Sequence, residues 1–274
     1  MKYSPVEANK ILQEYAFNFK KKFGQNFIVD ENIIDNIVNK TNILEDSLVI
    51  EVGPGSGALT YKLCQKAKQV LCFEIDETLK DILHNNLQEF ENVEIIFKDF
   101  LKVDLKEILS KYSYKNLYLV ANLPYYITTP IITKVIEEDI DIDKMVVMVQ
   151  KEVGERFNAK PNTKSYNSLS IFLQYHFNIN KIMDVSRNVF LPKPNVDSEV
   201  IEFTKKEKPQ INDINKFYSL VRDSFTQKRK TLRNNLKNYD LETIEEVLTK
   251  YGYDLSVRAE QLSIDIFIDI SNQL

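Results

Sequence analysis

The sequence predicts an α/β fold, in which a mostly parallel sheet covered by helices on both faces is followed by a small all-helical domain. Short segments that are apolar throughout alternate with amphipathic segments of helical period over the first 150 residues. Strands of that kind are buried on both faces, as parallel strands joined by crossover helices are. Beyond residue 213 the apolar residues repeat only at helical spacing, so the sheet is expected to end before that point.

Five segments are predicted to be the parallel strands, and helical periods lie between them. The strands are expected at 48–52, 70–76, 93–99, 117–122 and 145–150. The helices are expected at 32–44, from about residue 58, at 79–90 and at 127–138. This alternation of strand and helix is typical of a doubly covered parallel sheet.

Two further strands are predicted to form an antiparallel pair at the sheet edge. Residues 168–177 are expected to form a helix, or a helix that joins a strand, and the strands follow at 179–185 and 200–206. The proline-rich segment between these strands is too short for a crossover helix, which favours antiparallel pairing. Because KEKPQIND (206–213) has the composition of a linker, we expect one domain at 1–206 and a helical domain at 207–274.

The composition favours a globular protein without metals or disulfides. Hydrophobic residues make up 43% of the 274 residues, which is ample for a packed core. Cys64 and Cys72 fall in predicted helix and strand segments and are expected to be reduced core thiols. The acidic run 136–143 lacks the glycine and the later glutamate of a calcium loop, and neither histidine lies in an HExxH motif. No metal is therefore expected.

The sequence shows neither a membrane span nor a secretion signal. No segment approaches the ~20 consecutive apolar residues that a transmembrane helix needs. The first fifteen residues lack the apolar block of a signal peptide. We therefore expect a cytoplasmic protein without a membrane partner.

Basic residues gather in two short segments although the net charge is −4. Residues 222–237 hold six cations and one acid, and Lys20, Lys21 and Lys22 follow one another near the start. Localised positive charge on an acidic chain suggests a polyanion bound on one face. A solvated helix face is the alternative explanation.

A glycine-rich turn, EVGPGSGALT (51–60), joins a predicted strand to a predicted helix. In an α/β sheet this is where nucleotides bind, at the carboxyl edge. Its GxGxG spacing differs from the dinucleotide motif GxGxxG because Ala58 stands at the position of the third glycine, and no GK[ST] of a P-loop follows. A purely structural turn between strand and helix remains the alternative.

Acidic residues follow the next two predicted strands. Glu74 lies 21 positions after Gly53, where a carboxylate can accept both hydroxyls of a ribose, and Asp99 can accept from an adenine amino group. Each acid alone could be an ordinary helix N-cap. Together with the glycine turn they indicate an adenosine-bearing ligand. Without a phosphate site, S-adenosylmethionine fits better than a dinucleotide, its carboxylate meeting the helix start near Ala58.

The fourth predicted strand ends in Asn122-Leu123-Pro124-Tyr125. The side-chain carbonyl of Asn122 and the backbone carbonyl of Pro124 could accept the hydrogens of an adenine amino group and direct its lone pair toward a methyl donor. Tyr125 would stack on the base, which must first be extruded from any duplex. No general base is needed, because an N-methylated adenine cation releases its proton readily. A strand end with tyrosines as packing is the alternative.

These motifs together resemble those of the 16S ribosomal RNA adenine N6,N6-dimethyltransferases, the kasugamycin-sensitivity rRNA methyltransferases. The resemblance is carried by KKFGQNF near the start, the glycine turn, NLPY, FLPKPNVDS, SFTQKRKTLRNNL and RAEQLS, which span Lys20 to Ser263. It implies a Rossmann-like class I methyltransferase sheet, S-adenosylmethionine as cofactor, and dimethylation of two adjacent adenosines in the 3′-terminal hairpin of 16S rRNA.

The resemblance also implies roles for particular residues and a partner. The cofactor contacts it implies are Asn26, Ile28, Gly53, Glu74, Asp99 and Asn122. Phe190 would be a second aromatic wall facing Tyr125 across the target base, where the sequence alone equally favours packing. Lys228, Arg229, Lys230 and Arg233 would contact rRNA phosphates within an immature small ribosomal subunit, and the protein is expected to act as a monomer.

Two other functions remain open from the sequence. A macrolide-resistance methyltransferase, which modifies adenine N6 in 23S rRNA, shares NLPY-type sites, although FLPKPNVDS and RAEQLS favour the 16S group. A non-catalytic ribosome assembly factor could keep the fold, although the presence of Glu74, Asp99 and Asn122 argues against it. The position after NLPY, Tyr126, has no assigned role.

Overall fold

The computed structural model describes residue 10 and residues 25–274, which form two compact units. Among the described residues, one unit comprises 25–154 and 180–205, and the other comprises 155–179 and 206–274. The domain expected at 1–206 includes 155–179, whereas the structure groups this segment with the C-terminal helices. The predicted cations Lys20, Lys21 and Lys22 lie outside the described residues.

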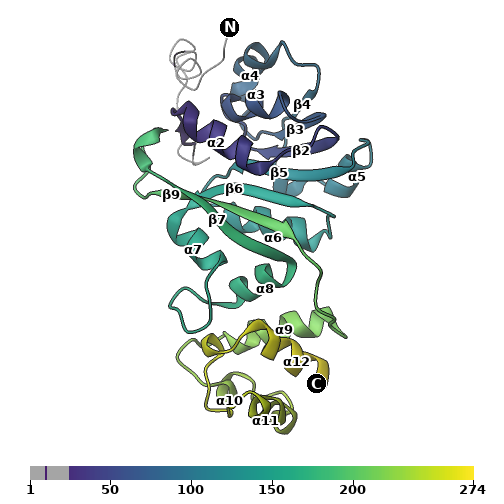
Figure 1. Ribbon diagram of the computed structural model, residues 1–274, viewed down its shortest axis with the longest axis vertical. Helices are drawn as coiled ribbons and strands as arrows, with labels where there is room; N and C mark the ends of the chain where they lie inside the picture. The colour runs from purple at the N-terminus through teal and green to yellow at the C-terminus, as the bar shows by residue number, and fades with distance from the viewer. Residues whose placement is uncertain (1–9, 11–24) are drawn as a thin grey trace. The chain divides into compact units, whose positions relative to one another are not determined.

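The first unit is built on a seven-stranded mixed sheet with the strand order β4-β3-β2-β5-β6-β9-β7 (Figure 1). The strands are β2 (Ser47–Val52), β3 (Gln69–Phe73), β4 (Val93–Ile96), β5 (Asn116–Asn122), β6 (Lys144–Gln150), β7 (Phe177–Val185) and β9 (Ser198–Lys205). The first five pair in parallel, and β9 runs antiparallel to β6. The predicted fold class, a class I methyltransferase sheet with antiparallel edge strands, is confirmed.

Helices connect the strands in the order that the alternating pattern predicts. They are α2 (Glu31–Thr41), α3 (Ala58–Cys64), α4 (Lys80–Leu87), α5 (Leu105–Leu109), α6 (Thr128–Glu137) and α7 (Lys151–Phe157). Short 3-10 turns, η2 (Glu77–Leu79) and η3 (Phe100–Lys102), follow β3 and β4. Figure 1 shows α2 in front of the sheet and α6 behind it.

The core on one face of the sheet is formed by α2, α3 and α4. Their buried apolar residues pack with alternate residues of the strands, such as Val49 and Val70, in a single cluster. Successive side chains of a strand point to opposite faces, and the central strands are buried on both, so they are mostly apolar along their length. Cys64 and Cys72 are both free and buried in this cluster.

A second, two-stranded sheet lies beside the main one. It pairs β1 (Phe27–Ile28) with β8 (Phe190–Leu191) in antiparallel orientation, and Ile28 stands opposite Phe190. The sequence analysis predicts neither strand, because two residues carry no periodic signal. This pairing joins the GQNF segment to the FLPKPNVDS segment.

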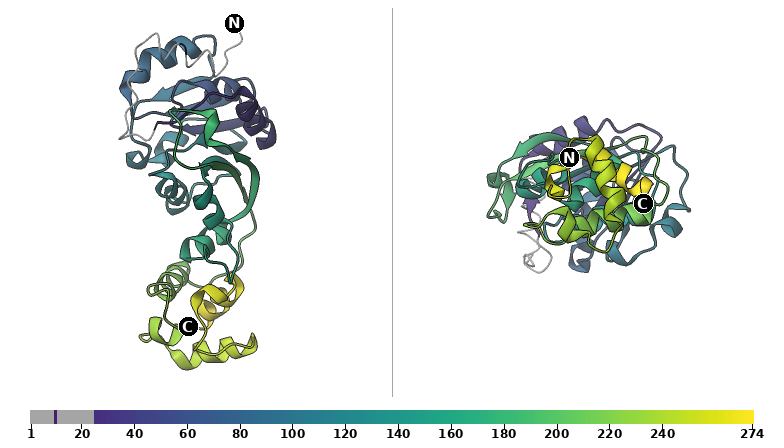
Figure 2. Two further views of the ribbon diagram at one scale, coloured as in Figure 1. Left: turned by 90° about the vertical axis from the view of Figure 1, so that its left-hand side faces the viewer. Right: turned by 90° about the horizontal axis from the view of Figure 1, so that it is seen from below.

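The second unit is helical and has its own apolar core. Its helices are α8 (Ser168–His176), α9 (Ile214–Ser224), α10 (Leu232–Asn235), α11 (Leu241–Lys250) and α12 (Ile264–Gln273). The helices from α9 to α12 gather together in every view (Figure 2). Among the residues that the structure describes, no helix is long and apolar enough to cross a membrane.

Candidate functional site

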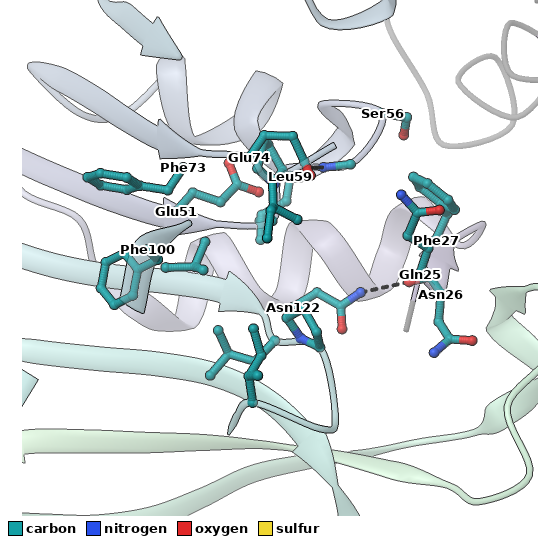
Figure 3. Close-up of a pocket in the computed structure, with 18 of the residues that line it drawn as sticks. Gln25, Asn26, Phe27, Glu51, Ser56, Leu59, Phe73, Glu74, Phe100 and Asn122 are labelled. Atoms are coloured by element: carbon teal, nitrogen blue, oxygen red, sulfur yellow. Dashed lines mark hydrogen bonds between the residues drawn. The ribbon is translucent and has the colours of Figure 1, made fainter. Parts of the chain in front are cut away.

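A pocket opens at the carboxyl edge of the parallel strands, where the sequence places its glycine turn. A cavity of about 260 Å³ is lined by the segments that follow β2, β3, β4 and β5, together with β1 (Figure 3). All six predicted cofactor residues line it: Asn26, Ile28, Gly53, Glu74, Asp99 and Asn122. In the described part of the chain, no group of three or more side chains is arranged to hold a metal ion.

The glycine turn needs glycine at two of its positions. Gly53 has a φ of +74°, and its N–H donates to the carbonyl of Phe73 at 2.9 Å. Gly55 has a φ of +60°, and a Cβ there would lie 2.7 Å from the ring of Phe27. Left-handed backbone and close approach of the β1 segment together exclude larger residues. The turn therefore leaves backbone, instead of side chains, facing the pocket.

Glu74 is a buried carboxylate at the edge of the pocket. It accepts hydrogen bonds from the backbone N–H groups of Asp76 at 2.8 Å and Gly55 at 3.3 Å. Burial raises its pKa to about 7, although these bonds oppose the shift. A buried carboxylate that keeps free acceptor positions favours a ligand that brings hydroxyl groups, and the two hydroxyls of a ribose are such groups.

Asp99 also lines the pocket and caps the 3-10 turn η3. Its carboxylate accepts from the N–H of Leu101 at 3.0 Å, so the helix-cap role that the sequence left open is present in the structure. Lys102 lies 3.7 Å away. The cap uses one oxygen and leaves acceptor capacity on a carboxylate that lines the pocket.

Glu51 lines the pocket and is only 1% exposed. It accepts from the hydroxyl of Thr60 at 2.6 Å and lies 3.7 Å from the Sγ of Cys72. Burial is the main cause that raises its pKa to about 8. Glu51 thus places a largely protonated carboxyl in the floor of the pocket at neutral pH.

Asn122 ends β5 with a fixed amide orientation. Its Nδ2 donates to the backbone carbonyl of Asn26 at 2.9 Å, a bond between segments 96 residues apart (Figure 3). Because the nitrogen is engaged in this way, Oδ1 is the atom of the amide left to accept a ligand hydrogen. Leu123 follows with its side chain buried and its N–H bonded to Met148 of β6.

The next two residues of the motif have different environments. The carbonyl of Pro124 accepts from the N–H of Ile127 at 3.1 Å and from the hydroxyl of Thr128 at 3.2 Å. The hydroxyl of Tyr125 lies 2.7 Å from that of Ser198 in β9. Tyr126 lines the pocket and is 53% exposed.

The comparison with known proteins identifies the family. The sequence model of the family described as ribosomal RNA adenine dimethylase matches residues 16–274. This chain belongs to the ribosomal RNA adenine dimethylase family. The dimethylase is therefore an enzyme that transfers methyl groups from S-adenosylmethionine to adenine in rRNA, as the resemblance implies.

Relatives and solved structures agree with this assignment. "Ribosomal RNA small subunit methyltransferase A" of Bacillus mycoides (strain KBAB4) is 46% identical over 281 residues, which cover 99% of this dimethylase and 96% of that protein. A dimethyladenosine transferase from Plasmodium falciparum superposes with a TM-score of 0.76 at 25% identity, covering 89% and 95% of the two chains. The 23S rRNA methyltransferase ErmE shares the fold, with a TM-score of 0.73 at 23% identity and coverage of 90% and 99%.

The structure places Phe190 differently from the other aromatic candidate of the dimethylase. Phe190 is 3% exposed and packs in the core with Phe27 and Ile28, and it is not among the residues that line the pocket. Tyr125, by contrast, does line it. In the present conformation Phe190 is thus packed as core, which was the alternative from the sequence, and its role as a second wall stays a prediction.

The predicted RNA-binding cations lie between α9 and α11 of the dimethylase and are exposed. The Nζ of Lys228 donates to the carbonyl of Lys164 at 2.9 Å, which adds a second basic loop to the segment. Arg233 is 3.9 Å from Glu245, with both side chains largely exposed. Lys228, Arg229 and Lys230 therefore present more uncompensated charge than Arg233 does.

Sequence reasoning missed several residues of the site. Gln25 donates to Asp76 at 2.9 Å and so ties the β1 segment to the turn after β3. Ile75 and Tyr126 are exposed side chains that line the pocket. Ile75 could have been found, since it directly follows Glu74; the Gln25 contact could not, because it joins residues 51 positions apart.

Proposed function

We propose that this dimethylase acts on 16S rRNA in the immature small ribosomal subunit, as a monomer. Its products would be two adjacent N6,N6-dimethyladenosines in the 3′-terminal hairpin. The observation that carries the proposal is the 46% identity, over 99% of the chain, to proteins named ribosomal RNA small subunit methyltransferase A. The 23S rRNA methyltransferase ErmE shares the fold at 23% identity, and a similarity at this level does not identify the substrate.

The pocket has the donor and acceptor groups that S-adenosylmethionine requires. Glu74 would accept from the ribose hydroxyls and Asp99 from the adenine amino group, while Gly53, Asn26 and Ile28 would line the rest. The fit is supported by the burial of the Glu74 carboxylate, which raises its pKa although backbone N–H groups donate to it. When bound, the cofactor supplies an electrophilic methyl group on a sulfonium.

Asn122 and Pro124 would prepare the target amine for attack. An adenine amino group is a weak nucleophile because its lone pair is delocalised into the ring. The Oδ1 of Asn122, oriented by the bond to Asn26, would accept one amino hydrogen. The carbonyl of Pro124 would accept the other once the hydroxyl of Thr128 rotates away, since two donors already occupy it.

The remaining catalytic effect would come from alignment. Tyr125 would stack on the extruded base, and the buried Leu123 would keep the backbone of the motif against β6. Holding two reactants in a productive geometry can contribute roughly 7–11 kcal/mol in favourable cases. No side chain needs to act as general base, because the N-methylated adenine cation formed by the transfer is acidic enough to lose its proton to water.

The exposed basic segment would hold the RNA. Lys228, Arg229, Lys230 and Arg233 would contact phosphates and give the complex a steep dependence on salt. Half or more of the hydrogen bonds in nucleic-acid complexes go to the backbone, which positions the substrate without reading its sequence. Specificity would then come from the shape of the subunit and from the pocket.

The proposed substrate is tested by incubating the protein and cofactor with small and large subunits from a strain that lacks both modifications. Mass spectrometry of nuclease fragments should show two methyl groups on each of two adjacent adenosines of 16S rRNA. Methylation of 23S rRNA instead would reverse the assignment, and no incorporation into either would favour an assembly factor.

Asn122→Ala provides the matching test of the site. It should abolish methyl transfer and leave cofactor affinity within several-fold, because the amide contacts the target amine. Asn116→Ala, at the opposite end of the same strand, is the control and should keep transfer. Unchanged turnover in Asn122→Ala would refute the acceptor role.

A further inference from the structure

The side chain of Tyr125, which follows β5, is hydrogen-bonded to β9, and β6 lies between these two strands in the sheet. Its hydroxyl is 2.7 Å from the hydroxyl of Ser198, the first residue of β9, and either oxygen can donate. Ser198 is fully buried, at 0% exposure, and stands opposite Gln150 in the β6–β9 ladder. The bond therefore joins the NLPY motif to a rigid part of the sheet.

The backbone around Ser198 is itself held in place. The carboxylate of Asp197 accepts from the N–H of Arg187 at 2.9 Å, and its carbonyl accepts from the N–H of Lys151 at 3.1 Å. The hydroxyl of Ser198 consequently has little freedom to follow a moving tyrosine. It acts as a fixed point for the far end of the Tyr125 side chain.

A fixed hydroxyl restricts the orientation of the whole aromatic ring. A tyrosine has two rotatable side-chain bonds, and both are defined when the ring is anchored at each end. Stacking on a base requires the ring plane to match the plane of that base. An untethered ring at the pocket would sample other orientations and would meet the base productively less often.

The position of Ser198 explains a part of its motif that Phe190 does not. Phe190, at the start of FLPKPNVDS, is buried in the core and does not line the pocket. Ser198, at the end of the same motif, bonds directly to a pocket residue. In this structure the motif reaches the site through its serine.

We propose that Ser198 is a positioning residue, whose hydroxyl holds the Tyr125 ring in the orientation that stacks on the target adenine. This inference rests on the proposed function, since it assumes that Tyr125 stacks on the base. Ser198 itself contacts neither the base nor the cofactor. Its effect should therefore appear in turnover and should depend on the hydroxyl of Tyr125.

A double-mutant cycle on methyl transfer to small subunits tests this dependence. Ser198→Ala and Tyr125→Phe should each lower kcat about three- to tenfold, the rate equivalent of one hydrogen bond. The double variant should be no slower than the slower single variant, because both changes remove the same bond. The KM for subunits and the Kd for cofactor should stay within about twofold of the parent, since neither hydroxyl binds either ligand.

A control variant separates positioning from a loss of stability. Ser47 is equally buried in the same sheet, and its hydroxyl donates to the carbonyl of Leu44 at 2.5 Å, away from the pocket. Ser47→Ala should lower the melting temperature but keep kcat. If Ser198→Ala does not fold, Tyr125→Phe alone must still show the same fall in kcat, because it keeps the ring and loses only the bond.

The outcomes distinguish this inference from the function on which it rests. Independent losses that multiply in the double variant, or an unchanged kcat in Ser198→Ala or Tyr125→Phe, would overturn the positioning role while the enzyme still methylates subunits. A parent protein that transfers no methyl group to subunits would overturn the proposed function and this inference together.

Discussion

Replacing Glu51 with glutamine should change the way in which the stability of the protein depends on pH. The Glu51 carboxyl is 1% exposed and accepts from the hydroxyl of Thr60 at 2.6 Å and, more weakly, from the thiol of Cys72 at 3.7 Å. Burial raises its pKa from 4.5 to about 8. In the unfolded chain the same group is exposed to water and ionises near its usual pKa.

The direction and size of the effect follow from these two pKa values. Because the folded pKa is raised, the stabilisation is fully present below the unfolded pKa and is lost as the pH rises toward about 8. At about 1.4 kcal/mol per unit, the loss between pH 5 and pH 7 is roughly 2–3 kcal/mol, and the complete loss is about 5 kcal/mol. Glutamine keeps the polar contact with Thr60 and does not titrate.

Urea unfolding without cofactor at pH 5, 6 and 7 measures this difference. The stability of Glu51→Gln relative to the parent should rise by roughly 2–3 kcal/mol from pH 5 to pH 7. Glu74 titrates in both proteins, so comparison of the two removes its contribution to first order. Glu91→Gln, an exposed glutamate, is the control and should follow the parent. Equal pH slopes in Glu51→Gln and parent would refute a buried, protonated Glu51.

Three other predictions follow from the site and the core. Glu74→Gln should weaken cofactor binding and remove most of its pH dependence. In the parent, the affinity for cofactor measured by calorimetry should rise about tenfold from pH 6 to pH 8 as Glu74 ionises. An equally steep rise in the variant would contradict this prediction. Replacing Lys228, Arg229 and Lys230 with glutamine should lower the slope of log affinity for subunits against log salt concentration by roughly 0.7–0.9 per lost phosphate contact. Lys250→Gln is the control and should keep the slope of the parent. An unaltered slope in the triple variant would show that residues 228–230 are not part of the interface. Gly154→Ala should destabilise the protein by about 1–3 kcal/mol in urea unfolding, because the new Cβ would lie 1.9 Å from Oε1 of the buried Glu199. This loss is expected although alanine favours helix more than glycine does. An unchanged unfolding midpoint would show that the Glu199 side chain moves aside freely.

The strands of the fold could be predicted because burial on both faces leaves a continuous apolar signal. The ends were less predictable, since they depend on backbone conformation that periodicity does not report. The first helix was expected to continue to Leu44, but it ends at Thr41 because Asn42 adopts a left-handed conformation with a φ of 53°. Leu44 is accordingly 52% exposed. Helix α7 was not predicted either, because its seven residues cover only two turns.

Residues of the candidate site could be predicted where a glycine, a carboxylate or an amide directly follows or ends a predicted strand. Gly53, Glu74 and Asn122 were assigned in this way, and the structure brings all three to one pocket. What the sequence could not show is which partners these groups already have. The Asp99 carboxylate caps a turn, and the Pro124 carbonyl has two donors, and both facts depend on three-dimensional contacts.

Support for the NLPY motif comes from both ends of one distant segment. The start of FLPKPNVDS pairs with β1, as Phe190 stands opposite Ile28, and the β1 segment carries the Asn26 carbonyl that orients Asn122. The end of the same segment carries Ser198, which holds Tyr125. Asn122 and Tyr125, the side chains proposed to bind the amine of the target base and to stack on its ring, are therefore oriented through one stretch of nine residues. This gives a physical reason for KKFGQNF, NLPY and FLPKPNVDS to occur together. Because the acceptor for Asn122 is a backbone atom, its orientation depends on the β1–β8 pairing and not on the identity of the Asn26 side chain.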